Sequence, residues 1–240
     1  FWLAKNNSKK LIVFFSGWGM DETPFKYLFS NEYDVLILYD YSDLLIKESI
    51  INKINSYKEI IIISWSMGVY AASRASKQFK KPSLAIAVNG TLMPLDNLCG
   101  IPIKLFDFTL DVTLKVMSEN NINAFYKNIF IENEDYERFL TMRPKRSVSN
   151  QKEELRKIKE YYLCSKEIVL DIPGQQTSLT SVVENIYDFA IIGIKDRVFL
   201  AKNQKNAWKN NKTNIIFVDQ AHHPFYIWNN WEDIIKLCSS

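Results

Sequence analysis

One stretch of the chain constrains its fold more than any other. Residues 60–63 are four consecutive isoleucines, which is typical of a strand buried on both faces of a parallel sheet. Residues 69–78 contain three alanines and neither glycine nor proline, which favours a helix. Between them lies Ser64-Trp65-Ser66-Met67-Gly68. The pattern therefore predicts a strand that turns sharply into a helix, with Ser66 at the tip of the turn.

This turn resembles the G-x-S-x-G nucleophile elbow, in which the residues two before and two after the serine are small because backbones come close there. Ser64 stands where that pattern has its first glycine. Serine is small enough to keep the turn feasible. The alternative is an ordinary buried strand-to-helix turn with two incidental serines, and the flanking strand and helix favour the elbow.

Strands and helices alternate on both sides of this turn. Alternating strands and helices predict a doubly wound, mostly parallel α/β sheet. Apolar runs predict strands at residues 11–15, 35–39, 60–63, 83–88, 189–194 and 214–218.

The alternation is interrupted in the middle of the chain. We expect the α/β core to comprise residues 1–93 and 167–240, with residues 94–166 inserted as a helical lid. Such a lid would cover the carboxyl ends of the strands, where ligands bind in open α/β sheets. Within it, helix-like segments lie at residues 109–118, 122–130, 135–140 and 151–162.

A serine hydroxyl is a weak nucleophile at neutral pH and needs an adjacent base. The only two histidines, His222 and His223, follow the last predicted strand. Asp196 follows the strand before it, and a carboxylate there can orient an imidazole. The order Ser66, Asp196, histidine is that of the α/β-hydrolase fold.

Each of these residues also has a simpler interpretation. The histidines could be a surface pair in a loop, and Asp196 could be an ordinary helix N-cap. The acid could instead come from Asp96 or Asp107, which follow the strand before the lid. Three weak signals in the right order, each at the end of a strand, favour a catalytic triad.

A tetrahedral intermediate needs two backbone N–H groups as an oxyanion hole. The residue after the nucleophile, Met67, supplies one. The loop after the first long strand is Gly17-Trp18-Gly19, and its glycines let it bend close to the elbow. We expect Trp18 N–H to be the second donor.

Composition excludes several other functions. The net charge is +3, from 30 Lys and Arg against 27 Asp and Glu, which is too balanced to indicate nucleic-acid binding. The apolar runs are far shorter than a membrane span of about 20 residues. Three cysteines without metal-site spacing indicate reduced thiols of a cytoplasmic protein. We expect no metal, no cofactor and no membrane contact.

Five motifs resemble a known family. Residues 15–21 (FSGWGMD), 64–68 (SWSMG) and 221–225 (AHHPF) resemble the pimeloyl-acyl-carrier-protein methyl ester esterases of biotin synthesis. Residues 88–91 (VNGT), and residues 100–102 (GIP) running into 106–110 (FDFTL), resemble the compact BioG-type branch. The resemblance spans most of the chain and is thin between residues 151 and 187.

The resemblance also carries differences. The related BioH-type branch has a histidine before G-W-G and a glycine before W-S, where this chain has Ser16 and Ser64. The family pattern His-x-Pro-Phe implies that His222 is the base and His223 its neighbour.

The resemblance implies a cytoplasmic, cofactor-free, monomeric serine esterase. It would hydrolyse the methyl ester of pimeloyl-acyl-carrier protein through an acyl-enzyme and release methanol. Alternatives are a general short-chain carboxylesterase or thioesterase with the same triad, and a silent hydrolase fold that only binds.

Because carrier protein is acidic, a basic docking face is expected. The candidates for it are Arg143, Arg146, Arg156 and Lys159 of the lid. The alternative is a solvated helix face on which these cations alternate with glutamates. The residues alone favour that alternative, and the family resemblance favours docking.

Overall fold

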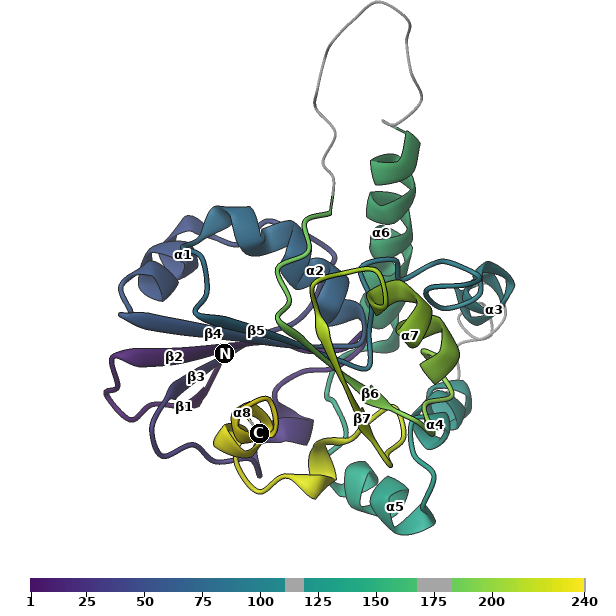
Figure 1. Cartoon of the computed structure of the whole chain (residues 1–240). Coiled ribbons are helices and arrows are strands. Elements are labelled where there is room, and N and C mark those ends of the chain that lie inside the picture. The colour runs from purple at the N-terminus through teal and green to yellow at the C-terminus, as the bar shows by residue number, and fades with distance from the viewer. Residues whose placement is uncertain (111–118, 168–182, 240) are drawn as a thin grey trace, which may run out of the picture.

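The computed structural model describes residues 1–110, 119–167 and 183–239 (Figure 1). The described residues form a seven-stranded sheet of order β1-β3-β2-β4-β5-β6-β7. Only β1, at one edge, is antiparallel to its neighbour. The strands are β1 (Trp2–Ala4), β2 (Lys10–Phe15), β3 (Asp34–Leu38), β4 (Glu59–Trp65), β5 (Leu84–Val88), β6 (Phe189–Gly193) and β7 (Asn214–Val218). The predicted mostly parallel sheet is confirmed, and β1 was not foreseen.

The four isoleucines of β4 show why this strand is apolar throughout. Successive side chains of a strand point to opposite faces of its sheet. Ile60 and Ile62 join one buried cluster, and Ile61 and Ile63 join the other. Both faces of the sheet are therefore covered, as a parallel sheet requires.

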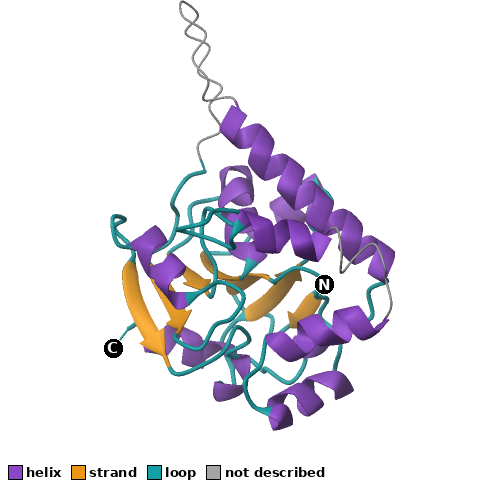
Figure 2. Ribbon diagram, turned by 90° about the vertical axis from the view of Figure 1, so that its right-hand side faces the viewer, coloured by secondary structure: helices purple, strands orange, loops and turns teal. Residues whose placement is uncertain are grey.

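Helices form a layer on each face (Figures 1 and 2). One face carries α1 (Glu48–Asn55), α2 (Met67–Ala75) and α7 (Ala201–Trp208), whose buried side chains belong to the cluster of Ile62. The other face carries α8 (Trp231–Leu237) with the short 3₁₀ turns η1 (Thr23–Phe25) and η4 (Phe225–Ile227). A further 3₁₀ turn, η2 (Ser76–Gln78), follows α2.

Four described helices lie between β5 and β6 in the sequence. They are α3 (Ile103–Phe108), α4 (Glu119–Asn128), α5 (Asn133–Thr141) and α6 (Val148–Glu167). Of the helix expected at residues 109–118, all but the first two residues lie outside the described residues.

These helices divide between the two faces of the sheet. Leu155, Ile158 and Tyr162 of α6 join the cluster of α2, whereas Tyr126 of α4 and Phe139 of α5 join the cluster of α8. The insertion thus straddles the edge at which the parallel strands end. Among the described residues, no helix is both long and apolar enough to cross a bilayer.

Candidate active site

The turn between β4 and α2 has the backbone geometry expected of a nucleophile elbow. Ser66 has φ 58° and ψ −125°, a backbone conformation that side chains rarely adopt. A Cβ at Gly68 would lie 2.3 Å from the carbonyl oxygen of Phe15. Only glycine fits there, because the end of β2 touches the first turn of α2. At the other small position, Ser64 is completely buried.

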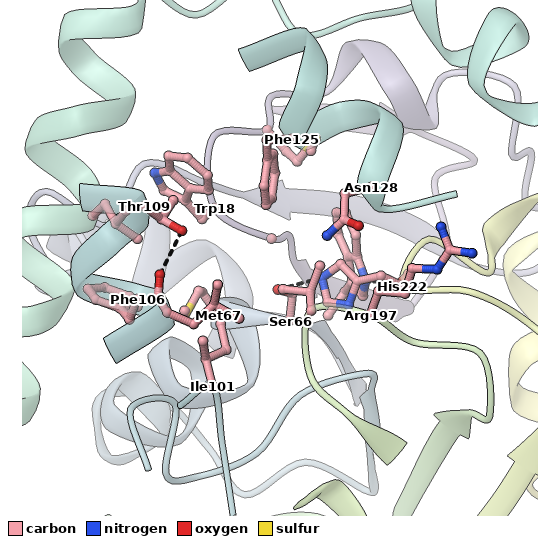
Figure 3. Close-up of a pocket in the computed structure, with 16 residues that line it drawn as sticks. Trp18, Ser66, Met67, Ile101, Phe106, Thr109, Phe125, Asn128, Arg197 and His222 are labelled. Carbon is pink, nitrogen blue, oxygen red and sulfur yellow. Dashed lines mark hydrogen bonds between the residues drawn. The ribbon is translucent and has the colours of Figure 1, made fainter. Parts of the chain in front are cut away.

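The structure brings three of the predicted residues into one hydrogen-bonded chain. His222 Nε2 lies 3.0 Å from Ser66 Oγ, and His222 Nδ1 lies 2.9 Å from Asp196 Oδ2. All three residues are at least 95 % buried. Figure 3 shows Ser66 and His222 side by side in the pocket. This is the arrangement in which an imidazole can take a proton from a serine hydroxyl while a carboxylate orients the imidazole.

Asp196 is held by its own loop. Its Oδ1 accepts hydrogen bonds from the N–H groups of Val198 (2.7 Å) and Phe199 (2.9 Å), and its Oδ2 also accepts one from Gln204 Nε2 (3.0 Å). Asp196 is not the N-cap of α7, which is Leu200. Its Oδ1 closes the turn before that helix, which leaves Oδ2 to contact His222.

The two alternative acids have other partners. Asp96 Oδ1 accepts hydrogen bonds from the N–H groups of Leu98 and Cys99, both at 2.9 Å, and so closes its own loop. Asp107 forms an ion pair with Lys159 of α6, at 2.6 Å. Of the three carboxylates considered, Asp196 is the one bonded to His222.

His223 occupies a different environment. Its ring is fully enclosed by aromatic side chains from η1, β4, the inserted helices and η4. Within the described part of the chain its two ring nitrogens have no hydrogen-bond partner. Burial, with the neighbouring His222, lowers the pKa of His223 from 6.5 to about 3. His223 is therefore a neutral packing residue at neutral pH.

Asn89, directly after β5, holds the loop of His222 in place and was not singled out for that role. Its φ is 44°, and its Nδ2 donates to the carbonyl oxygens of Ala221 (2.8 Å) and His222 (3.0 Å). Its Oδ1 accepts from the N–H of Gly193, at 2.6 Å. Asn89 thus ties the histidine loop to the strand that precedes Asp196. The Asn-Gly pair directly after a strand was the available sequence signal.

Trp18 and Met67, the two residues expected to supply an oxyanion hole, both lie beside Ser66. Both line the same pocket as Ser66. Met67 is the first residue of α2, so its N–H has no partner within the helix. A Cβ at Gly17 would lie 2.8 Å from the ring of Trp65, which shows how closely this loop approaches the elbow.

The pocket above Ser66 is mainly apolar (Figure 3). Its walls include Trp18, Ile101, Leu105, Phe106, Phe125 and Leu155. Asn128 and Arg197 also line it and are exposed. In Figure 3 the guanidinium of Arg197 points away from Ser66. The pocket suits an aliphatic chain that enters from solvent and ends at the serine.

Three other aromatic residues of the segment between β5 and β6 pack in the core and do not line the pocket. Tyr126, Phe130 and Phe139 are at least 97 % buried and belong to the core cluster of α8. Phe125, by contrast, faces the pocket and packs edge-on against Trp18, with ring centroids 4.9 Å apart.

The structure corrects one of the docking residues. The side chain of Arg146 is only 6 % exposed and forms ion pairs with Glu154 (2.7 Å) and Asp40 (3.1 Å). Since its guanidinium is enclosed by the protein's own carboxylates, Arg146 is not available to an external partner. Arg146 follows Pro144 and Lys145, a sequence typical of an exposed turn, and this pattern gave no sign that its side chain would be buried.

The remaining docking candidates are partly neutralised. Arg156 is paired with Glu153 and Glu160 along the exposed face of α6, and Lys159 is paired with Asp107. Arg143 is half-buried. Exposed pairs of this kind contribute little to stability, and they also reduce the field that a distant acidic partner would feel.

Comparison with known proteins places these features in a family. The family model described as "Pimeloyl-ACP methyl esterase BioG" matches residues 3–234. A Bacteroides fragilis (strain 638R) protein described as "Malonyl-[acyl-carrier protein] O-methyltransferase" is 33 % identical over 216 residues, which are 90 % of this chain. The chain spans only 40 % of the length of that relative.

Solved structures agree on the fold. A crystal structure of BioG from Haemophilus influenzae superposes with a TM-score of 0.77 at 25 % identity and covers 95 % of each chain. A lipase-esterase related protein from Clostridium acetobutylicum has a TM-score of 0.61 at 15 % identity, over 100 % of this chain and 97 % of that one, and supports the fold alone. The predicted α/β-hydrolase fold is confirmed.

Proposed function

Because the chain belongs to the family described as pimeloyl-ACP methyl esterase BioG, we propose that it is a serine esterase that hydrolyses the methyl ester of pimeloyl-acyl-carrier protein. The observation that carries the proposal is the buried hydrogen-bonded chain Ser66–His222–Asp196 at the end of an apolar pocket. An esterase of this class needs a nucleophile, a base and an orienting acid, and no cofactor.

In the proposed reaction, Ser66 Oγ attacks the carbonyl carbon of the methyl ester while His222 Nε2 takes the serine proton. Asp196 stabilises the imidazolium that forms. The negative charge on the carbonyl oxygen is stabilised by the N–H groups of Met67 and Trp18. His222 then gives its proton to the departing methoxide, so methanol leaves and an acyl-enzyme remains.

Water completes the cycle. His222 removes a proton from a water molecule, which attacks the acyl-enzyme carbonyl. Collapse of the second tetrahedral intermediate returns the proton to Ser66 and releases a free carboxylate on the carrier-linked chain. The acyl-enzyme step and the roles of the three residues are part of the proposal.

The shape and lining of the pocket support a carrier-linked substrate. A methyl ester at the end of an aliphatic chain can reach Ser66 through apolar walls, while the carrier stays outside. We propose that the helices within residues 94–166 form this covering wall, over a core of residues 1–93 and 167–240. The end of the pocket that faces solvent is where the carrier must approach.

We further propose that the acidic carrier protein docks beside the mouth of the pocket, next to Arg197. Arg197 is exposed there, and within the part of the chain that the structure describes it forms no ion pair with a carboxylate. Arg156 and Lys159 of α6 already have carboxylate partners. Arg197 therefore has more of its charge available for steering.

The second candidate function is a general short-chain carboxylesterase or thioesterase. The same triad and apolar pocket would serve it, since neither feature by itself requires a carrier. It predicts similar efficiency on a free ester and on the carrier-linked ester. A binding-only role is disfavoured, because it would not need three buried side chains in hydrogen-bonded order.

The test compares two substrates. The purified protein is incubated with pimeloyl-carrier-protein methyl ester and with dimethyl pimelate, and kcat/KM is measured for each by methanol release. We expect a clear preference for the carrier-linked ester and no turnover by Ser66→Ala. Equal kcat/KM on both esters would favour the general esterase, and turnover by Ser66→Ala would exclude Ser66 as nucleophile.

A further inference from the structure

Glu154 of α6 is a buried carboxylate whose hydrogen bonds end on the loops beneath the active site. It is completely buried. Its Oε2 accepts from the N–H of Gly19 (3.0 Å) and from Arg146 Nη1 (2.7 Å), and its Oε1 accepts from the N–H of Tyr41 (3.0 Å). One side chain of an inserted helix thus binds the loops that follow β2 and β3.

The loop after β2 is the one that contains Trp18. Gly19, which Glu154 holds, is the next residue along. Gln151 lies one turn earlier on α6, and its carbonyl oxygen accepts a hydrogen bond from Trp18 Nε1 at 2.6 Å. Residues three apart share a helix face. The same face of α6 therefore binds this loop twice, at the side chain of Trp18 and at the backbone N–H of Gly19.

The loop packs closely against α6 at Gly19. Gly19 has φ +74°, and a Cβ there would lie 2.7 Å from Gln151 Oε1. On the other side, Gly17 is in close contact with the ring of Trp65. Trp18 is therefore held between two glycines that pack tightly against α6 and the elbow.

Stability alone is a poor explanation for a charge in this position. Burial raises the pKa of Glu154, although Arg146 opposes that effect. Replacing a buried ion pair with apolar residues is often neutral or stabilising, so such a pair is weak evidence of a stabilising role. What apolar residues cannot do is accept two backbone N–H groups at fixed positions.

Arg146 completes the arrangement. Its guanidinium bridges Glu154 and Asp40 and also donates to the carbonyl oxygen of Met20, at 3.2 Å. Met20 follows Gly19 directly. The cation therefore fixes the orientation of Glu154 and contacts the same loop one residue further on.

We propose that Glu154, oriented by Arg146, is a positioning residue that sets the direction of the Trp18 N–H toward the oxyanion. The inference rests on the proposed function, because it needs an ester whose carbonyl oxygen develops charge at that N–H. If Glu154 has this role, α6 stays bound to the loop of Trp18 during catalysis and does not open as a rigid lid.

The test is Glu154→Gln, assayed with a p-nitrophenyl acyl ester. Glutamine has the same shape but one acceptor oxygen in place of two, so a loop N–H or Arg146 loses its partner. Losing an oxyanion donor costs about 10²–10³ in kcat. A displaced donor costs less, and we expect kcat to fall about 10- to 100-fold while KM changes less than about threefold.

A second measurement separates positioning from general damage. A trifluoromethyl ketone binds serine hydrolases as a tetrahedral oxyanion, so its inhibition constant reports on the oxyanion hole. We expect that constant to rise in proportion to the fall in kcat. The fraction of active sites labelled by a fluorophosphonate at completion should stay that of the parent.

Glu232→Gln is the matched control. Glu232 is another buried carboxylate (8 % exposed) that accepts from the N–H groups of Asn31 (2.9 Å) and Glu32 (3.0 Å). It does not line the pocket. We expect its substitution to lower the melting temperature and to leave kcat within about twofold of the parent.

Retention of the parent kcat by Glu154→Gln would overturn the inference. So would a loss of kcat that matches a loss of labelled active sites, because that loss reflects unfolding alone. If Glu154→Gln does not fold, Arg146→Lys replaces it, since one ammonium cannot bridge both carboxylates and Met20. A several-fold fall in kcat at constant KM supports the inference, and an unchanged kcat overturns it.

Failure of the proposed function is recognised separately. If the parent turns over the p-nitrophenyl ester but not the carrier-linked methyl ester, the proposed substrate is wrong. The effect of Glu154→Gln on the p-nitrophenyl ester still decides the positioning role.

Discussion

Asp196→Asn tests the proposed catalytic roles most directly, because asparagine keeps the shape of the side chain and changes one atom. Its amide oxygen can still accept from the N–H groups of Val198 and Phe199, as Oδ1 of Asp196 does. Its NH₂ group then faces His222 Nδ1 and Gln204 Nε2, where Oδ2 of Asp196 accepted. The bonds from Val198 and Phe199 are therefore preserved, the bond to His222 is inverted, and the bond from Gln204 Nε2 is lost.

The inversion sets the expected magnitude. An NH₂ donor opposite Nδ1 favours the histidine tautomer that carries its proton on Nε2, the nitrogen 3.0 Å from Ser66 Oγ. That nitrogen can no longer accept the serine proton. In a well-studied serine protease the same substitution lowers kcat by about 10⁴. We expect a similar loss here, equivalent to about 5.4 kcal/mol in the activation free energy.

The assay is kcat on a p-nitrophenyl ester, with thermal unfolding measured in parallel. Asp34→Asn is the control: Asp34 is also buried (5 % exposed), and it accepts hydrogen bonds from the N–H of Asn6 and from the hydroxyl of Tyr57, outside the pocket. We expect Asp34→Asn to destabilise the fold and keep kcat within a few-fold. If Asp196→Asn keeps kcat within tenfold of the parent while Asp96→Asn is severe, the assignment of the acid is refuted.

Four further predictions follow from the site. His222→Ala should abolish turnover while His223→Phe, which fits the aromatic enclosure, retains it; the reverse result would exchange their roles. Because the pKa of His223 is lowered from 6.5 to about 3, only the unfolded chain binds a proton there between these pH values. This group's contribution to the unfolding free energy should be complete above pH 6.5 and fall by about 1.4 kcal/mol per unit on acidification toward pH 3; urea unfolding of His223→Phe should lack that part of the slope. Asn89→Asp should lower both stability and kcat, because a carboxylate oxygen would face the carbonyls of Ala221 and His222; unchanged kinetics and melting temperature would contradict this. Arg197→Glu should raise KM for the carrier-linked ester at low salt and leave KM for the small ester unchanged, whereas Arg156→Glu should raise KM for the carrier-linked ester less. An equal rise in both variants would mean that α6 contributes to docking as much as Arg197 does.

Local signals were enough to predict much of the site. Ser66 and Asp196 each follow a strand, and His222 comes in the loop after β7. Carboxyl ends of parallel strands lie along one edge of a sheet, so residues placed there meet whatever the details of packing. The alternation of strands and helices indicated the parallel sheet, and this regularity is why the order of the three residues was informative.

The family resemblance supplied what local signals left open. It distinguished His222 from His223 through the sequence that follows them. The structure gives the physical reason for that difference: His222 faces a carboxylate and a serine, whereas aromatic rings enclose His223.

The burial of Glu154 in α6 and of Arg146 just before it was not foreseen, although the helical spacing of α6 indicated part of it. Leu155, Ile158 and Tyr162 recur at helical spacing and form a buried stripe along α6. Glu154 and Gln151 lie on the same stripe at helical spacing, which was the signal for their burial. Because Glu154 is charged and Gln151 is polar, both side chains would ordinarily be exposed to solvent. Arg146 is charged too, and for that reason it was expected to face an external partner.

The sequence alone therefore determined which residues share a strand end or a helix face, because these relations follow from the fixed geometry of strands and helices. Only the tertiary structure decided what each face meets. The inner face of α6 meets the loop of Trp18, where two backbone N–H groups need an acceptor and Glu154 supplies it. A buried charge is stable only beside its partners. Two of these partners, the N–H groups of Gly19 and Tyr41, come from segments more than a hundred residues away, which no local pattern specifies.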